Sequence, residues 1–145
     1  MSLFSVLSVS ASGMSAERTR AELLVENLAN AETTRTPEGG PYRRKDAVFT
    51  SAPQTSPFSA VFQTEMGSGV SGVEVSDVLT DTRDGERRYQ PGHPDADKDG
   101  YVVYPRVNPA EDLVDLMGAS NAFQGNIAAM SAIKNMILNS IDLMK

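Results

Sequence analysis

NPAEDLVDLMGASNAFQGNIAAMSAIKNMILNSIDLMK, residues 108–145, sets the architecture of this chain. Its apolar residues recur in two interleaved seven-residue series, which together give the spacing of a coiled-coil stripe. These are Leu116, Phe123, Met130, Ile137 and Met144, and then Leu113, Ile127 and Ile141. A further apolar line, Ala122, Ala129, Met136 and Leu143, runs beside them. We therefore predict one long helix whose apolar side is wider than a solitary helix needs.

The start of this helix carries clear capping signals. Asn108 can cap the first turn, Pro109 suits the first helical position, and Glu111 is placed for a capping box. The acidic residues Glu111, Asp112 and Asp115 lie near the positive end of the helix dipole. A helix over residues 109–143 would be about 50 Å long at about 1.5 Å per residue, too long for most domains of this size to enclose.

Residues 3–30 repeat the pattern with smaller side chains, so we predict a second helix there that ends near Asn30. Arg18 interrupts its apolar stripe, as Ser120 and Lys134 interrupt the C-terminal one. The two cations either fix the register of pairing or extend to water. We expect the helices to form an antiparallel-type coiled coil and an assembly interface. Its residues are Phe4, Leu7, Ala11, Met14, Ala21, Val25 and Leu28, packing on Leu113, Leu116, Phe123, Ile127, Met130, Ile137 and Ile141, with Met144 beyond.

The middle of the chain has turn chemistry and short alternating segments. Residues 36–41, Thr-Pro-Glu-Gly-Gly-Pro, read as a linker. Short strands are expected at residues 42–50, 61–65, 72–80, 87–90 and 100–107. The fold class is therefore α+β, with an N-terminal helix in residues 1–35, a β-rich insert in 36–107 and a C-terminal helix in 108–145.

The composition and net charge of the chain argue against several classes of function. The 145 residues carry a net charge of −6, which argues against a partner with a phosphate backbone, so no nucleic acid is expected. The absence of cysteine excludes disulfides and thiolate chemistry. No basic residue precedes Arg18, and no apolar run approaches the length of a membrane span, so we expect neither a cleaved signal nor membrane insertion.

Two short motifs suggest ligand sites, and each has a plainer interpretation. Residues 67–72 match the G-x-G-x-x-G string of dinucleotide sites, but an alternating strand pattern follows where a helix is needed, which favours a hairpin turn. Residues 95–100, Asp-Ala-Asp-Lys-Asp-Gly, resemble half of a calcium loop. Arg106 stands where that loop requires a bidentate acid, which favours a solvated acidic turn.

Catalytic groups are scarce. His93 is the single histidine and lies between Gly92 and Pro94, where a turn is the expected structure. The basic run Arg43-Arg-Lys45 either docks on an acidic neighbour or lies on a solvated strand edge. We expect no enzyme, no cofactor and no metal. A calcium-binding module and a phosphate-using enzyme are the alternatives from other functional classes.

Specific strings resemble a known family. They are SGMSAERTR at 12–20, ENLANA at 26–31, GPYRRKD at 40–46, YQPGHPDAD at 89–97, GYVVYP at 100–105 and ASNAFQ at 119–124. Together they resemble the bacterial flagellar axial proteins, the rod and hook subunits, and the Tyr-Arg-Arg-Lys and Pro-Gly-His-Pro strings are similar to those of the proximal rod members. A hook or distal rod subunit is the alternative within the family, but the insert is short for one.

The resemblance implies a structural subunit of the rod that transmits motor torque across the periplasm. Such proteins pack their terminal helices in the inner layer of a helical tube, with the insert facing outward. The implied partners are other copies of the chain, adjacent proximal and distal rod subunits, the rod-base adaptor protein and the type III export apparatus. Export without a cleaved signal suits a chain that lacks disulfides. Helices that cannot bury their stripes alone are expected to fold fully only on assembly.

Overall fold

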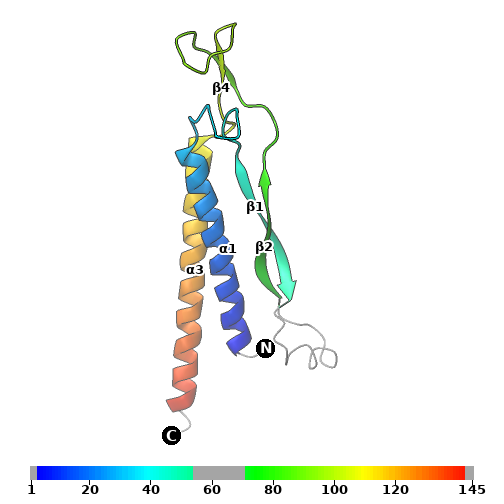
Figure 1. Ribbon diagram of the computed structural model, residues 1–145. Coiled ribbons are helices and arrows are strands. Elements are labelled where there is room, and N and C mark those ends of the chain that lie inside the picture. Colours follow the sequence, from blue (N-terminus) through cyan, green and yellow to red (C-terminus); the bar gives the residue numbers. More distant parts are fainter. Residues whose placement is uncertain (1–2, 54–70, 143–145) are drawn as a thin grey trace.

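The computed structural model describes residues 3–53 and 71–142, apart from the side chains of Leu3, Phe4 and Pro53. Two long helices, α1 (Leu3–Ala29) and α3 (Pro109–Asp142), lie side by side and antiparallel (Figure 1). Between them in sequence come β1 (Lys45–Pro53), β2 (Ser71–Thr80), β3 (Arg87–Tyr89) and β4 (Tyr101–Val103). This arrangement confirms the predicted α+β fold with paired terminal helices and a small β-rich insert.

The beginning of α3 follows from the predicted cap. The side-chain oxygen of Asn108 accepts a hydrogen bond from the backbone N–H of Ala110 at 3.2 Å, and its carbonyl accepts one from Asp112 at 3.0 Å. Of the predicted capping box, only the Asn108 half forms, since Glu111 makes no hydrogen bond back to Asn108. At the other terminal helix, Asn30 closes the last turn of α1 by bonding back to the carbonyl of Glu26.

One face of α3 packs on α1. Asp112, Ala119 and Ile133, spaced at seven-residue intervals with Asn126 between the last two, are the buried residues of α3. Next to them lie four half-buried apolar residues, Leu116, Phe123, Met130 and Ile137. Gly13 of α1 allows close approach, because a Cβ there would lie 3.4 Å from the side-chain amide of Asn126. The contact therefore combines one predicted apolar series with a series of smaller and polar residues.

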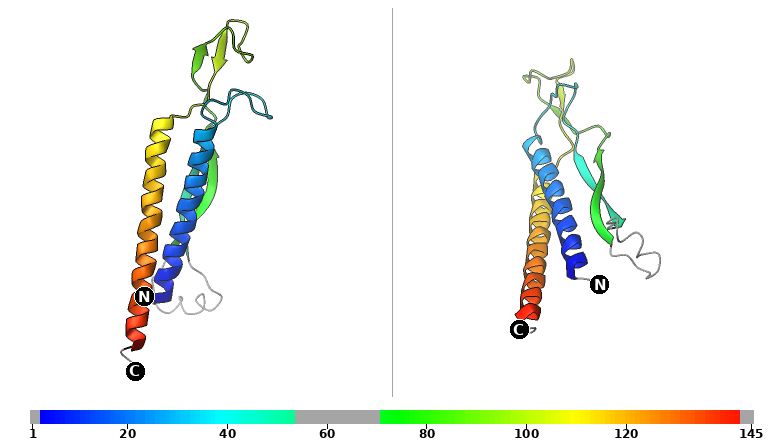
Figure 2. Two further views of the ribbon diagram at one scale, coloured as in Figure 1. Left: turned by 90° about the vertical axis from the view of Figure 1, so that its left-hand side faces the viewer. Right: turned by 60° about the horizontal axis from the view of Figure 1, so that its bottom comes forward.

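A two-stranded antiparallel ribbon, β1–β2, runs along the opposite side of α1 from α3 (Figure 2). Its register pairs Lys45 with Thr80 and Pro53 with Ser71, with an irregularity between Val48 and Phe49. The backbone N–H of Val73 donates to the hydroxyl of Ser12, which ties the ribbon to α1 at 3.1 Å. Gly72, the last glycine of the G-x-G-x-x-G string, is buried in β2, whereas residues 67–70 and the predicted strand at 61–65 lie outside the described residues.

A shorter ribbon, β3–β4, projects beyond the ends of the helices and carries the tip of the molecule (Figure 1). It pairs Arg87 with Val103 and Tyr89 with Tyr101. Two predicted strands were too long: Tyr42–Arg44 precede β1, and residues 104–107 follow β4. Pro105 lacks an amide hydrogen and cannot continue a ladder, while the side chains of Tyr42 and Arg44 bond to the helices instead.

Candidate functional site

The point where α1 ends and β1 and α3 begin, here called the neck, is built on a buried asparagine. Asn27 has no exposed surface. Its amide group donates to the carbonyl of Lys45 at 2.8 Å, and its oxygen accepts from the Lys45 backbone N–H and the Tyr42 hydroxyl, both at 2.9 Å. Burial, followed by the charges of Glu26 and Asp112, raises the pKa of Tyr42 to about 12. Asn27 thus fixes the insert to the end of α1.

A buried ion pair fixes the other helix. Arg44 places a guanidinium nitrogen 2.9 Å from the carboxylate of Asp112, whose side chain is fully buried. Burial raises the pKa of Asp112, although the charge of Arg44 opposes the shift. Neither carboxylate oxygen accepts a hydrogen bond of good geometry. Arg44 also contacts Asp46 at 3.1 Å, so one side chain links the first turn of α3 to β1.

In the basic run at residues 43–45, each cation has an acidic partner within the same chain. Arg44 pairs with Asp112, and Lys45 pairs with Glu26 at 2.6 Å. The side chain of Arg44 is only 18% exposed. Both of these cations find their partners on the helices, and the run serves to orient the insert.

The acidic turn at residues 95–100 also bonds within the chain. Asp95 accepts a hydrogen bond from the hydroxyl of Thr34 at 2.8 Å and lies 3.8 Å from Arg35. His93 accepts a bond from the backbone N–H of Asp95, as expected of a turn residue. Within residues 3–53 and 71–142, no three acidic or histidine side chains converge as a metal site requires.

The predicted interface residues fall into two groups. Leu7, Met14, Ala21 and Leu28 of α1 and Leu116, Phe123, Met130 and Ile137 of α3 are partly buried in the single chain. Ala11, Val25, Leu113, Ile127 and Ile141 are exposed, so the expected packing of the last three on α1 does not occur within one chain. The side chains of Phe4 and Met144 lie outside the described residues. Arg18, 75% exposed and paired with Glu22, extends to water, and Lys134 is exposed.

The exposed members on α3 belong to an apolar row. Leu113, Met117, Ile127, Leu138 and Ile141 share one side of the helix, because at about 100° per residue they fall within an arc of about 120°. We call this row the outer ladder. Each is between 45% and 61% exposed. Met117 and Leu138 were missed in the sequence, although their spacing from Leu113 and Ile141 could have identified them. A groove of about 360 Å³ runs beside the ladder, between α1 and α3, lined by Ala21, Leu116 and Phe123 among others.

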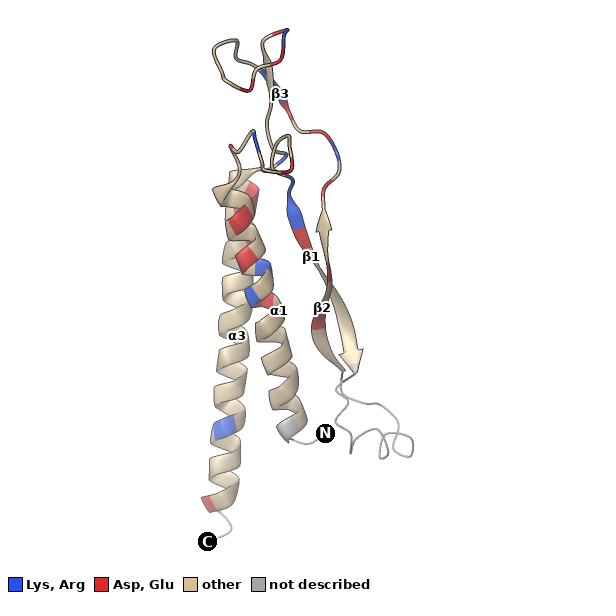
Figure 3. Cartoon of the chain, in the orientation of Figure 1, with Lys and Arg blue, Asp and Glu red and all other residues tan. Residues whose placement is uncertain are grey.

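Charge is concentrated at one end of the molecule (Figure 3). From residue 3 to residue 16 α1 has no charged residue, and beyond Asp115 α3 has only Lys134 and Asp142. The neck and the β3–β4 ribbon hold most of the arginines and aspartates. Neither helix in the described part of the chain has an apolar stretch long enough to cross a membrane. The lower halves of the helices thus present a face of low charge, which suits contact with other protein surfaces.

Comparisons with known proteins bear on this geometry. The family model for the C-terminal region of flagellar basal-body rod FlgEFG proteins matches residues 98–143. The chain is 36% identical to the flagellar basal-body rod protein FlgC of Bacillus subtilis, with all of both chains covered. It is 34% identical to FlgC of Borreliella burgdorferi, over 100% of this chain and 99% of the relative. The chain belongs to the FlgC family.

FlgC of Escherichia coli is similar as well, at 32% identity over 99% of this chain and 98% of the relative. Membership of the FlgC family makes the chain a structural component of the flagellar basal-body rod and confirms the resemblance noted in its sequence. Two of the strings that carried the resemblance meet at the neck. The ENLANA string supplies Asn27, and the GPYRRKD string supplies Tyr42, Arg44 and Lys45. In this chain those FlgC-like strings join the insert to the helices.

Proposed function

We propose that this chain is a subunit of the proximal rod that assembles through its terminal helices into a helical tube. The tube transmits motor torque across the periplasm. Its partners are further copies of itself, adjacent proximal and distal rod subunits and the rod-base adaptor protein. It reaches the rod through the type III export apparatus. It has no catalytic activity, and its role is mechanical.

The outer ladder carries this proposal. A helix with one apolar face completes its packing inside the chain, but α3 has a second apolar face beside the first. Burying the exposed remainder of each ladder residue contributes about 1 kcal/mol, roughly half the value of a full apolar side chain. Five such residues, together with the groove along Ala21 and Phe123, make a surface that a helix of a second copy can fill. Contact between two different faces does not close into a dimer and can therefore repeat along a tube.

The division of the chain follows from this role. Residues 1–35 and 108–145 form the inner part of the tube, and the insert at 36–107 faces outward. Asn27 and the Arg44–Asp112 pair fix the direction of the insert relative to the helices. Torque that passes between neighbours through the helices is then passed to the insert by the neck.

Replacing Ile127 by aspartate tests the ladder. Ile127 is 45% exposed, so Ile127→Asp should leave the isolated chain folded as before while placing a charge in the interface. We expect normal export, loss of incorporation into rods and loss of swimming in cells that carry only this variant. Incorporation is measured by immunoblotting purified basal bodies.

Asn121→Asp is the matched control, because Asn121 is exposed on α3 and lies outside the ladder. This variant should assemble and swim. Circular dichroism spectra of both variants should match the wild type. Swimming by cells that carry Ile127→Asp would show that the ladder is not an assembly surface.

A further inference from the structure

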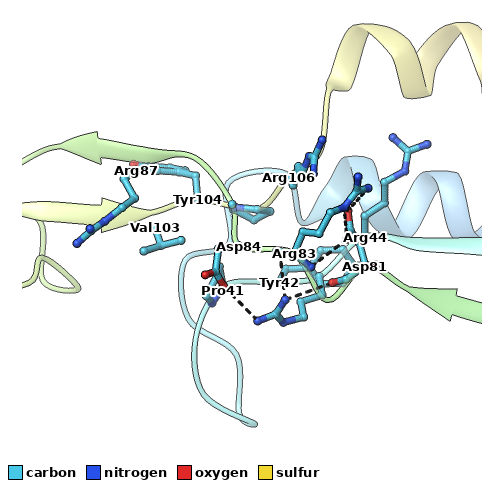
Figure 4. Close-up of a pocket in the computed structure, with 13 residues that line it drawn as sticks. Pro41, Tyr42, Arg44, Asp81, Arg83, Asp84, Arg87, Val103, Tyr104 and Arg106 are labelled. Carbon is cyan, nitrogen blue, oxygen red and sulfur yellow. Dashed lines mark hydrogen bonds and ion pairs between the residues drawn. The ribbon is translucent and has the colours of Figure 1, made fainter.

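A second surface of this chain has an unmatched charge. A cavity of about 300 Å³ opens where the β3–β4 ribbon joins the neck, and we call it the neck pocket (Figure 4). Pro41, Tyr42, Tyr104 and Pro105 form much of its wall. Its charged lining consists of Arg43, Arg44, Arg83, Arg87 and Arg106 against Asp81 and Asp84. In a chain with a net charge of −6, five arginines around one cavity reverse the local charge.

Four of these arginines have a carboxylate partner in the chain. The shortest nitrogen–oxygen distances are 2.9 Å for Arg44–Asp112, 2.7 Å for Arg83–Asp81, 3.7 Å for Arg87–Asp97 and 3.9 Å for Arg43–Asp84. These pairs account for four of the five arginines that line the neck pocket.

Arg106 is exposed and, alone among the arginines of residues 3–53 and 71–142, makes no hydrogen bond or ion pair. Its charge acts on Asp81, but that carboxylate already accepts three side-chain hydrogen bonds from Arg83, at 2.7, 2.8 and 3.1 Å, and one from the Arg83 backbone N–H at 3.0 Å. The pocket therefore has a free guanidinium at its edge.

The wall of the pocket is held in a defined shape. Gly85 passes so close to the segment that follows β4 that a Cβ at this position would collide with the carbonyl oxygen of Tyr104. The amide of Tyr104 donates to the carbonyl of Glu86 at 2.9 Å, and Arg88 lies over the Tyr104 ring, 4.8 Å from its centroid. A pocket of this size, with prolines and tyrosines on its walls and a guanidinium at its edge, fits a short acidic side chain on a narrow turn.

The chain carries such a turn at its tip. The amide of Gly100 donates to the carbonyl of Asp97 at 2.8 Å and closes a tight turn, with Gly100 at a φ of 79°. Asp97 faces Arg87, whereas Asp99 is exposed and makes no ion pair in the described part of the chain. The tip points away from the helices (Figure 1), so β4 separates Asp99 from Arg106 of the same chain.

We propose that the neck pocket receives the Asp97–Gly100 turn of a second copy and that Asp99 of that copy pairs with Arg106. The contact rests on the proposed assembly into a tube, to which it adds a specific partner for the insert. Tip and neck are different surfaces, so this contact also repeats from copy to copy without closing. It joins the outward parts of neighbouring subunits, while the ladder joins their helices.

Cross-linking tests the contact directly, because the chain has no cysteine of its own. Arg106→Cys and Asp99→Cys are expressed together, from two genes, in a flagellated bacterium whose own FlgC has been deleted, and the cells are treated with a mild oxidant. We expect a disulfide-linked dimer that contains one copy of each variant. Cells that express either variant alone should give none of that product. Assembled rods without the mixed dimer would overturn the proposal.

Charge reversal provides a second readout that does not depend on cysteine chemistry. Arg106→Asp and Asp99→Arg should each reduce the yield of rods about fivefold, as the loss of an exposed ion pair and its replacement by like charges imply. The double variant should recover most of the yield. A double variant that assembles no better than the single ones would contradict the pairing.

Glu38→Arg, at another exposed loop, is the control for the choice of occupant. If it, rather than Asp99→Arg, restored Arg106→Asp, the pocket would receive a different loop and the proposal would fail. The Ile127→Asp experiment separates this failure from that of the proposed function. If Ile127→Asp fails to assemble, and the two cysteine variants assemble into rods without the mixed dimer, the ladder stands as an assembly surface and only the tip-to-neck contact is ruled out.

Discussion

Asn27 and Asp112 are both buried polar residues at the neck, but their surroundings differ. Asn27 uses its amide nitrogen and oxygen in three hydrogen bonds, so its burial costs little. Asp112 has a single cation, Arg44, as compensation, and neither of its oxygens accepts a well-directed hydrogen bond. A buried pair of this kind contributes little net stability, yet removing one partner leaves an uncompensated charge.

The raised pKa of Asp112 predicts a pH dependence. The folded chain binds this proton more tightly than the unfolded chain, where the pKa is near 3.8. The associated stability is complete below that value and is lost as pH rises through the raised pKa of the folded chain. Relative to Asp112→Asn, the free energy of unfolding of the wild type should therefore fall from about pH 4 upward. The fall amounts to about 1.4 kcal/mol for every tenfold difference in proton affinity between the folded and unfolded chains.

Urea unfolding of both chains across this pH range measures the difference. Asp99→Asn is the control for the loss of one acidic charge at an exposed position. A difference between wild type and Asp112→Asn that stayed constant with pH would show that the carboxyl titrates alike in the two states.

Sequence patterns predicted where the buried polar residues of the neck lie in the chain, but not which residues they contact. They placed Asp112 in the first turn of α3 and Asn27 near the end of α1. They did not predict that Arg44 would be the partner of Asp112, because no local rule links residues so far apart in the chain. A charge run also looks the same in sequence whether its cations face water or a buried carboxylate.

At the scale of elements, the periodicity predicted the helices well and their contact only in part. The expected limits, 3–30 and 108–145, agree with Leu3–Ala29 and Pro109–Asp142 within the described residues. The contact was assigned to two apolar series of α3, and the one that contains Leu116 and Phe123 is partly buried there. The place of the other, which contains Leu113 and Ile127, is taken by Ala119 and Ile133. Two adjacent faces of α3 have a heptad spacing, and hydrophobicity alone favours the larger side chains. The close approach at Gly13 selects the face with the smaller ones.

Gly13→Leu tests whether this close approach matters. A side chain at this position would press on Asn126, since the Cβ alone lies 3.4 Å from its amide nitrogen. Overpacking of this kind costs about 1–3 kcal/mol, which exceeds the gain of up to about 1 kcal/mol from replacing a helical glycine. We expect a net loss of stability in urea unfolding.

Gly118→Leu is the matched substitution on α3, where nothing lies within 4 Å of a Cβ. In the isolated chain it should gain stability from helix propensity alone. If the two variants changed stability equally, the packing of α1 on α3 would be looser than the structure indicates.

At the scale of the whole molecule, the core is thin. Its buried apolar residues, in the described part of the chain, are Ala16, Leu24, Tyr42, Val102, Ala119 and Ile133. These six residues, two of which are alanines, are spread over both helices and the insert of an elongated molecule (Figure 1). The sequence predicted that one chain cannot bury the apolar stripes of its terminal helices. It did not predict the separation of the insert into two ribbons, because each strand run looks alike until its pairing is known.

Because the core is thin, we expect the backbone amides of the helices to gain most of their protection from hydrogen exchange on assembly. In a dilute solution of the isolated chain, backbone amides of α1 and α3 should exchange with deuterium within minutes. In purified basal bodies the same segments should resist exchange for hours, because neighbours cover the outer ladder. Hydrogen exchange followed by mass spectrometry compares the two. Slow exchange of both helices at high dilution would show that one chain is stable by itself.

The loop of residues 36–40 lies near the opposite end of the helix pair from Leu3 and Asp142 (Figure 1). Gly39 and Gly40 both have positive φ, and a Cβ at either would meet no atom within 4 Å. An affinity tag or fluorophore inserted there would avoid the helical faces, whereas one attached beside Leu3 or Asp142 would crowd them. This loop is therefore the better place from which to watch single subunits join a growing flagellum under the microscope.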